Sequence, residues 1–473
     1  MRGALALALI SVAGCRDDVD GYYLQHCFLP MPDAPTTCDA ADQKRFVSSV
    51  LRAHHLFRDQ LRRVDLEDYE TPEEILAAMT TGISPPDRFS FLASLSSEEQ
   101  FFEEGKILGL GLSLRFVGDE LRLSQVFGSD EGEPESPASK AGLERGDVVE
   151  AIGDEAVEHL IREGRLGEAL GPNEPGASVN LSLRRGEGEV FDVVVARDFF
   201  EIDPVPVHEI IETARGPVGY VVLRSFIEPA VPALERAMAD FRAAGVREVI
   251  LDLRYNGGGL VSVARRLGSL LAGNVAPNEI LFQRRYNDQN RNCLEVDVLE
   301  PTRVGLERLD RLVALTLEGT ASASEQLIDG LAPHVDVTTV GERTFGKPVG
   351  QLGFPFCEDR LLRPMTFQTL NALGHGGYFD GLEPTCVVPE TVNAAFGDED
   401  EVLLRAGLTY LESGVCRGST SLKSRTSEPV VLAMSIARRR SSAETSSSEP
   451  RSTRSMESSS GSTDLSNDRS IAR

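Results

Sequence analysis

The sequence predicts an α/β protein with a β-rich module before its core, a helical N-terminal segment and a disordered C-terminal tail. Residues 216–272 read as strand, helix, strand, helix, and such alternation favours a layered core with parallel strands. Residues 106–198 carry short alternating strands separated by glycine turns, which is typical of a compact strand-rich module. After Gly414, Ser, Arg, Thr and Glu dominate, and a segment so poor in large apolar residues is expected to stay disordered.

Length and charge limit the classes of function. The 473 residues are 41% hydrophobic, which suits two or three domains with sizeable cores. Acidic side chains outnumber basic ones 74 to 48, giving a formal net charge of −26. Because this charge opposes phosphate backbones and anionic lipid heads, we expect no nucleic-acid partner, and membrane contact only through an anchor.

Residues 1–15 have the pattern of an export signal. Arg2 precedes the apolar stretch "GALALALISVAG", which is shorter than the roughly 20 residues that span a bilayer. The stretch "SVAGC" resembles the lipobox of bacterial lipoproteins, in which the cysteine becomes the lipid-modified first residue. We therefore expect an exported protein of the bacterial cell envelope (periplasm), lipid-anchored at Cys15. Plain export, or a buried Cys15, is the alternative.

Cysteine usage agrees with export. The sequence has 7 cysteines, and setting Cys15 aside leaves an even number that can pair completely. Cys27 and Cys38 lie close together in a proline-rich segment, so a Cys27–Cys38 disulfide is the predicted bridge. The sequence assigns no pairing to Cys293, Cys357, Cys386 and Cys416.

The N-terminal segment is predicted to span residues 16–100. Thr71, Pro72 and Glu74 stand at the N-cap, first helical and capping-box positions of one helix. His54 and His55 have no Cys, Asp or Glu around them at metal-ligand spacing. We expect a surface or packing role for these histidines and no metal site.

Residues 101–198 form the predicted strand-rich module. Its stretch "SPASKAGLERGDVVEAIGDEAV" (136–157) resembles the PDZ domains of exported proteases, with "GLGL" in the place of the carboxylate-binding loop. A PDZ domain binds a peptide C-terminus as an added strand, while loop amides hold the terminal carboxylate. An ordinary small β domain is the alternative, and the acidic insertion 129–135 is expected to repel acidic ligands. The loop residues are Gly109, Leu110, Gly111 and Leu112.

Two serines precede an apolar helical run in "TASASEQLIDGL". Ser322 and Glu325 stand at capping-box spacing, which places Ser322 at a helix N-terminus. Backbone amides and the helix dipole favour developing negative charge there. Taken alone, the stretch is also compatible with an ordinary helix cap.

A lysine follows in "GERTFGKPVGQ". A serine hydroxyl is a poor nucleophile until a base removes its proton. Lys347 can serve only if burial or a cationic neighbour lowers its pKa from about 10.4 toward neutrality. Gln351 is placed to orient the amine, and Pro348 biases Lys347 toward an extended conformation. The expected apolar walls are Phe345, Val349 and Phe354.

The same stretch superficially matches a phosphate-binding loop. Gly341–Lys347 fits the start of that motif, but Pro348 replaces the Ser or Thr that holds magnesium and lacks an amide hydrogen. Nucleotide hydrolysis is therefore not expected. The glycines of "NGGGL" (256–260) follow a strand without the spacing of dinucleotide binders, so we expect them to expose backbone amides.

The motifs "EVILDLRYNGGG", "TASASE" and "GERTFGKPVGQ", in this order and after a PDZ-like module, resemble the C-terminal processing (tail-specific) serine peptidases. The resemblance covers about residues 60–414 and includes "PPDRFSFL" (85–92) and "NALGHGGYFDGLEP" (371–384). It implies a crotonase-like α/β protease core over residues 199–414, with residues 415–473 as a low-complexity tail.

The resemblance also implies roles for single residues. Ser324 would be structural, and Pro348 departs from the glycine of many members, which leaves the shape of its loop open. The implied site has Ser322 as nucleophile, Lys347 as general base, Gln351 orienting the lysine, and an oxyanion hole from the amides of Ala323 and of Gly257 or Gly258.

The sequence thus predicts an exported serine endopeptidase with a Ser-Lys dyad, which cleaves proteins recognised through their free C-termini and uses no metal or cofactor. Two alternatives stay open. A histidine base would have to be His334, near the far end of the serine's helix, or His375, which no motif links to the serine. A catalytically inert PDZ-containing adaptor that binds exported proteins is the other.

Overall fold

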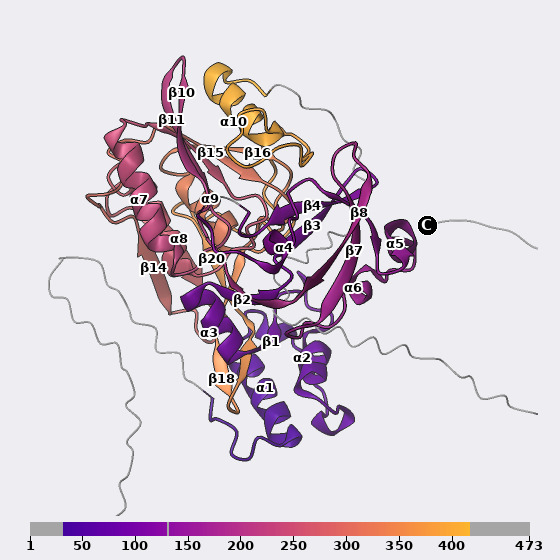
Figure 1. The fold of residues 1–473 in the computed structure, drawn as a ribbon. Helices are drawn as coiled ribbons and strands as arrows, with labels where there is room; N and C mark the ends of the chain where they lie inside the picture. Colours follow the sequence, from indigo (N-terminus) through magenta and orange to yellow (C-terminus); the bar gives the residue numbers. More distant parts are fainter. Residues whose placement is uncertain (1–31, 130–131, 417–473) are drawn as a thin grey trace, which may run out of the picture. The chain divides into compact units, whose positions relative to one another are not determined.

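The computed structural model describes residues 32–129 and 132–416. The predicted signal sequence with Cys15, and residues 417–473 of the predicted tail, lie outside them. The described chain is α/β, as predicted, and Figure 1 shows its helical, β-rich and mixed parts. Within the described residues, no helix is long and apolar enough to cross a membrane.

The N-terminal segment is mainly helical. The predicted capping box is confirmed, since Thr71 caps a helix that has Pro72 at its start and Glu74 reaching back to the cap. An apolar cluster joins these helices to Phe354 and Phe356, which lie far along the chain, and Figure 1 shows α1 beside β18. The elements are α1 (Ala40–His54), η1 (Arg58–Gln60), η2 (Leu66–Asp68), α2 (Pro72–Thr80), β1 (Phe91–Ser94) and α3 (Leu95–Glu104).

The β-rich module has its own apolar core, which residues between Leu110 and Val195 form. Its sheet has the strand order β3-β4-β5-β7-β8, and a separate pair joins β2 to β9. Gly164, whose φ is 68°, lies between two short helices of this module, at 157–162 and 166–169. The elements are β2 (Lys106–Gly109), β3 (Leu112–Val117), β4 (Glu120–Val126), α4 (Pro137–Lys140), β5 (Val148–Ile152), β6 (Glu155–Ala156), α5 (Val157–Arg162), α6 (Leu166–Ala169), β7 (Ser178–Arg184), β8 (Val190–Ala196) and β9 (Asp198–Glu201).

One residue of the acidic insertion of this module, Glu133, is buried and paired. Glu133 Oε1 accepts a hydrogen bond of 2.7 Å from Nη1 of Arg224, and both side chains are almost fully buried. Its Oε2 accepts from the amide of Gly128 at 2.6 Å. The expectation that the insertion repels acidic ligands is therefore wrong for Glu133, because its charge is already paired.

The core is a mixed sheet with the order β10-β11-β12-β15-β16-β21, and its strands from β11 to β21 run parallel, as predicted. Val249 and Leu251 of β12 pack with α7, α8 and α9, while Ile250 faces α10 on the other side. Burial on both faces explains why these strands read as continuous apolar runs. The elements are β10 (His208–Thr213), β11 (Gly216–Val222), α7 (Ala230–Ala243), β12 (Glu248–Asp252), α8 (Val261–Ala272), β15 (Arg311–Thr316), α9 (Ala323–Leu331), β16 (Asp336–Gly341), β21 (Cys386–Val387) and α10 (Val402–Ser413).

Two smaller sheets complete the core. One has the order β14-β13-β20-β17, and the other joins β1 of the N-terminal segment to β19 and β18. The second sheet places the loop before β1 close to the chain around β17. The elements are β13 (Ile280–Arg285), β14 (Leu294–Val298), β17 (Val349–Gln351), β18 (Phe354–Phe356), β19 (Arg360–Arg363) and β20 (Met365–Leu370).

The predicted Cys27–Cys38 disulfide is wrong. Cys38 is bonded to Cys357, with the two Cα atoms 5.6 Å apart and a sequence separation of 319 residues. A second disulfide joins Cys386 to Cys416. Proximity in sequence suggested the first pairing, but the fold brings the start of α1 against the turn between β18 and β19.

Candidate active site

Ser322 lies on a strained turn between β15 and α9. Its φ of 56° and ψ of −115° are rare for a residue with a side chain. Gly258 permits this turn, because a Cβ atom on Gly258 would lie 2.7 Å from Ser322 Cβ. Such a sharp strand-to-helix turn presents a serine hydroxyl at the N-terminus of the helix that follows.

Asn256 joins the serine turn to the glycine loop 256–259. Its backbone carbonyl accepts from the amide of Ala321 at 3.0 Å and from the hydroxyl of Ser324 at 3.1 Å. Its side-chain amide donates to the carbonyl of Leu223 at 2.7 Å. Ser324 is fully buried, so its hydroxyl holds the turn and does not face a substrate.

The two candidate oxyanion glycines differ in what their amides contact. The amide of Gly258 donates to Oδ1 of Asn256 at 2.9 Å, and Gly258 is buried. Gly257 is exposed, and among residues 32–129 and 132–416 no acceptor is bonded to the amides of Gly257 or Ala323. The amides of Gly257 and Ala323 therefore fit an oxyanion better than that of Gly258.

The lysine loop, residues 342–348, carries Lys347 with its amine held in place. Nζ of Lys347 donates to Oε1 of Gln351 at 2.7 Å, and Gln351 in turn donates through Nε2 to the carbonyl of Phe89. The ring of Phe89 lies 6.0 Å from Nζ. Sequence reasoning missed Phe89 as a wall and wrongly named Phe354, which packs with the N-terminal helices. The apolar cluster beside the amine contains Phe89, Val349, Met365, Phe345 and Phe379.

Glu325 connects the serine turn to the lysine loop. Its Oε2 accepts from the backbone amides of Ser322 at 2.9 Å and Lys347 at 2.8 Å. Its Oε1 accepts from the hydroxyl of Thr344 at 2.5 Å and the amide of Gly346 at 2.7 Å. Burial raises the pKa of the Glu325 carboxyl, and these hydrogen bonds act in the opposite direction. Capping-box spacing had indicated only the contact with Ser322.

A buried ionic cluster lies immediately before the glycine loop. The guanidinium of Arg254 contacts Asp252 at 2.7 Å, Glu390 at 2.8 Å and Glu401 at 2.7 Å, and all four side chains are fully buried. Burial alone would lower the pKa of Arg254, but Asp252 and Glu390 outweigh it and raise that pKa well above its usual value. Arg145 of the β-rich module also reaches Glu390, at 3.4 Å. Sequence reasoning missed this cluster, because Glu390 and Glu401 lie far along the chain from Asp252 and Arg254.

Asp329 of α9 is expected to make folding stability fall as pH rises. Burial raises its pKa from 3.8 to about 6, so the folded state keeps the proton that the unfolded state loses between these values. Stability should therefore decrease from about pH 4 to 6, and Asp329→Asn should remove that slope and gain roughly 1–3 kcal/mol at pH 7. Urea unfolding at pH 4 and pH 7 measures this, with Asp336→Asn at an exposed position as control. An equal gain at both pH values would contradict the prediction.

The histidines do not meet the serine. His334 comes after α9, a helix of 9 residues or about 13 Å, and its Nε2 contacts the carbonyl of Ile280 at 2.8 Å. His375 lies in an exposed loop and its amide donates to Asn371. A surface or packing role was predicted for His54 and His55, and both are buried, which favours packing over the surface.

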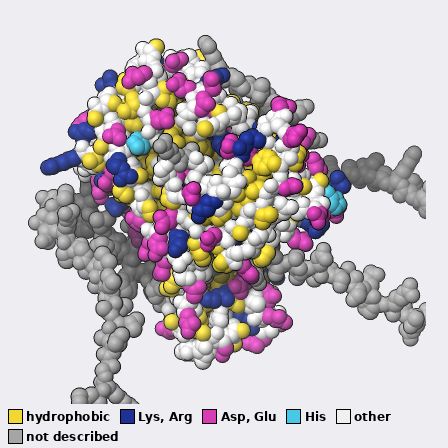
Figure 2. All heavy atoms as spheres, in the orientation of Figure 1, with side chains coloured by type: hydrophobic (Ala, Val, Ile, Leu, Met, Phe, Trp, Pro, Cys, Tyr) yellow, Lys and Arg dark blue, Asp and Glu magenta, His cyan; other side chains and the backbone are white. Residues whose placement is uncertain are grey.

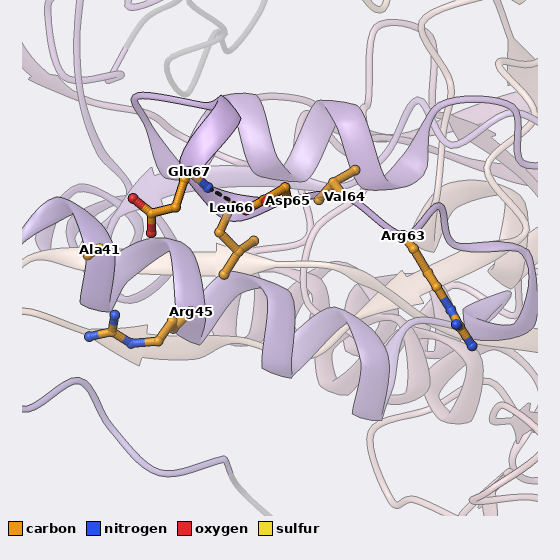
Figure 3. Close-up of a pocket in the computed structure, with 7 residues that line it drawn as sticks. All are labelled: Ala41, Arg45, Arg63, Val64, Asp65, Leu66 and Glu67. Atoms are coloured by element: carbon orange, nitrogen blue, oxygen red, sulfur yellow. Dashed lines mark hydrogen bonds between the residues drawn. The ribbon is translucent and has the colours of Figure 1, made fainter.

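Other features of the described surface carry no such chemistry. A cavity of about 610 Å³ lies in the N-terminal segment, and Figure 3 shows Arg45 and Glu67 at one end and Arg63 pointing away. It offers no nucleophile beside a base. Within the described residues, no group of three or more His, Cys, Asp or Glu is arranged to hold a metal. Acidic and basic side chains are interspersed on the face in Figure 2.

Comparisons with known proteins show what this chain is similar to. Residues 217–388 match the model of peptidase family S41. The chain is 23% identical over 404 residues to the "Probable CtpA-like serine protease" of Staphylococcus saprophyticus, a match that covers 78% of this chain and 76% of that protein. The relative of the same description from Staphylococcus epidermidis is 24% identical over 301 residues, covering 63% of this chain and 57% of that protein.

Solved structures show the same fold. An S41 protease from Bacteroides fragilis has a TM-score of 0.63 at 24% identity, covering 78% of this chain and 97% of that chain. The photosystem II D1 C-terminal processing protease has a TM-score of 0.51 at 18% identity, with the same coverage of 78% and 97%. The family match and these relatives indicate a serine peptidase, and the solved structures show its fold. Over residues 217–388 the chain is similar to peptidase family S41, and over most of its length it is similar to the CtpA-like serine proteases.

Proposed function

We propose that this chain is an exported serine endopeptidase in which Ser322 is the nucleophile and Lys347 the general base. The observation that carries the proposal is the Glu325 carboxylate, which binds the backbone amides of both residues. Gln351 then directs the amine of Lys347. Two disulfides within the described chain support an oxidising compartment. The leader pattern supports a lipid anchor at Cys15 in the bacterial cell envelope.

The proposed reaction proceeds through an acyl-enzyme. The neutral amine of Lys347 accepts the proton of the Ser322 hydroxyl as its oxygen attacks a peptide carbonyl carbon. The amides of Ala323 and Gly257 donate to the oxyanion, a contribution of roughly 3 kcal/mol per donor in studied proteases. Lys347 returns the proton to the leaving amine, and water then hydrolyses the ester through the same base. These steps use no metal or cofactor.

The β-rich module is proposed to act as a PDZ domain. Among the described strands β3 pairs with β4 alone, which leaves its other edge for an added peptide strand. Gly111, just before β3, has a φ of 80°, and a Cβ atom there would lie 2.2 Å from the hydroxyl of Ser136. The loop from Gly109 to Leu112 is proposed to hold the terminal carboxylate of a substrate, which would keep that substrate near Ser322.

Cleavage of an unstructured protein with an apolar C-terminus tests the proposal. The chain from residue 16 onward should cut it, while Ser322→Ala and Lys347→Met should lose at least about 1000-fold in kcat/KM. Fragments are read by mass spectrometry. His375→Ala is the matched control and should retain the parent's rate. A substrate whose C-terminus is amidated should show a raised KM, because the loop amides then lack a carboxylate.

The outcomes separate the alternatives. Equal cleavage by the parent and Ser322→Ala would sink the proposed nucleophile, and a large loss in His375→Ala alone would favour a histidine base. If the parent does not cut but binds the free C-terminus, the chain is an adaptor.

A further inference from the structure

We propose that Arg88 is a positioning residue for the lysine loop, an inference that rests on the proposed role of Lys347 as base. Arg88 lies in the loop between α2 and β1. Its Nη2 donates to the backbone carbonyls of Phe345 at 3.0 Å, Gly346 at 3.3 Å and Phe379 at 3.1 Å. The Gly346 carbonyl belongs to the peptide bond that carries the Lys347 nitrogen. The guanidinium therefore holds the peptide unit from which the base extends.

Through its neighbour Phe89, the segment that carries Arg88 also reaches the side chain of the base. The guanidinium carbon lies 4.6 Å from the ring centre of Phe345 and 5.2 Å from that of Phe89. The Phe89 ring is the one that faces Nζ of Lys347, and the Phe89 carbonyl accepts from Gln351. Arg88 thus contacts the main chain just before Lys347. Phe89 contacts Gln351, the residue that directs the amine of Lys347.

The segment that carries Arg88 is itself fixed. The Asp87 carboxylate accepts from the amides of Phe89 at 3.0 Å and Ser90 at 2.9 Å. It also contacts Nε2 of His55 at 2.9 Å, and the side chains of this pair are fully buried. Because Asp87 sits in a closed network, Arg88 extends from a rigid turn, unlike most exposed arginines.

The two loops that Arg88 bridges touch at Gly346. The φ of Gly346 is +87°, and a Cβ atom there would lie 2.4 Å from the carbonyl oxygen of Phe379. The bridge therefore closes a tight contact beside the base. A shift of about 1 Å at a reacting group costs about 100-fold in rate. Loss of the guanidinium should consequently lower kcat more than it changes KM.

The test compares the parent chain from residue 16 onward with Arg88→Met, Arg88→Lys and Ser322→Ala. The control is Arg45→Met, which removes an arginine with 60% side-chain exposure from α1. We measure kcat and KM on the protein substrate, the rate at which a fluorophosphonate labels Ser322, and the melting temperature. Arg88→Met should lose about 10- to 100-fold in kcat and in labelling rate, with KM within about twofold.

Guanidinium ion separates positioning from general stability. Guanidinium at tens of millimolar should restore part of the activity of Arg88→Met and leave Arg45→Met unchanged. Arg88→Lys should recover only partly, because an ammonium lacks the planar fork. Arg88→Met with the parent's kcat would overturn the proposal, while the proposed function stands. If Arg88→Met does not fold, Arg88→Lys decides. An Arg88→Lys variant with the parent's kcat overturns the proposal, and a folded Arg88→Lys variant with a lowered kcat supports it. Cleavage by Ser322→Ala at the parent's rate would remove the proposed function and this inference together.

Discussion

The variant Glu325→Gln is expected to lose about 100- to 1000-fold in kcat/KM, although neither the size of the side chain nor the helix changes. Each carboxylate oxygen of Glu325 accepts two hydrogen bonds, one pair from Thr344 and Gly346 and the other from Ser322 and Lys347. A glutamine has one acceptor oxygen, so its NH2 group faces two donors in either orientation. Two buried donors then lose their partner, and the serine turn and the lysine loop separate.

The expected loss is in kcat, since the substrate's own contacts are not changed. Steady-state cleavage of the protein substrate gives kcat and KM, and the melting temperature reports the accompanying destabilisation of a few kcal/mol. Glu318→Gln is the matched control, because it makes the same change four residues before Ser322 at an exposed position. If Glu325→Gln kept the parent's kcat, the hydrogen bonds of Glu325 to the amides of Ser322 and Lys347 would not be needed for the proposed reaction.

Replacement of Arg254 is expected to have the largest effect on stability. Arg254→Met removes the cation that Asp252, Glu390 and Glu401 share in a fully buried site. Breaking a buried ion pair from one side costs about 3–5 kcal/mol, because the remaining charge has no partner and no water. Three carboxylates lose their shared cation here, although Glu390 keeps its contact with Arg145, so we expect at least that loss, or failure to fold at 37 °C.

The destabilisation of Arg254→Met should shrink as pH falls. Burial already raises the pKa of the Asp252 carboxyl, and Arg254 opposes that rise. Without the cation this pKa lies further above its unfolded value, so folding takes up a proton and stability is lost as pH rises. Urea unfolding at pH 4.5 and pH 7.5 measures the difference. Arg265→Met is the control, since its side chain is 40% exposed and pairs with Glu300 at the surface, where at most about 1 kcal/mol is expected. A loss at pH 7.5 as small as that of the control would contradict this account.

Much of the core was predictable because its signals are local. The alternation of apolar and amphipathic runs over residues 216–272 specified strands and helices that the structure confirms. The helix that starts at Thr71 follows from its capping box alone. The sequence also placed Ser322 at the start of α9, as the capping-box spacing predicted.

The partners of those residues were less predictable. Phe89 replaces Phe354 as the wall of the amine, because an N-terminal loop packs against the lysine loop. The choice between Gly257 and Gly258 depends on the side chain of Asn256, which occupies the amide of Gly258. The spacing of residues along the chain predicts neither the apolar wall of the amine nor which glycine amide is open.

The sequence by itself determined which segments form helices and strands. It also determined which residue types make up the candidate site and their order along the chain. Both follow because caps, periodicity and glycine runs act over a few residues. Only the tertiary structure decided that Cys38 bonds Cys357, that Glu133 is paired with Arg224, and that Glu325 holds both loops. These contacts join segments that lie apart in the chain. Their formation depends on how the sheets and the N-terminal segment pack, which no local pattern records.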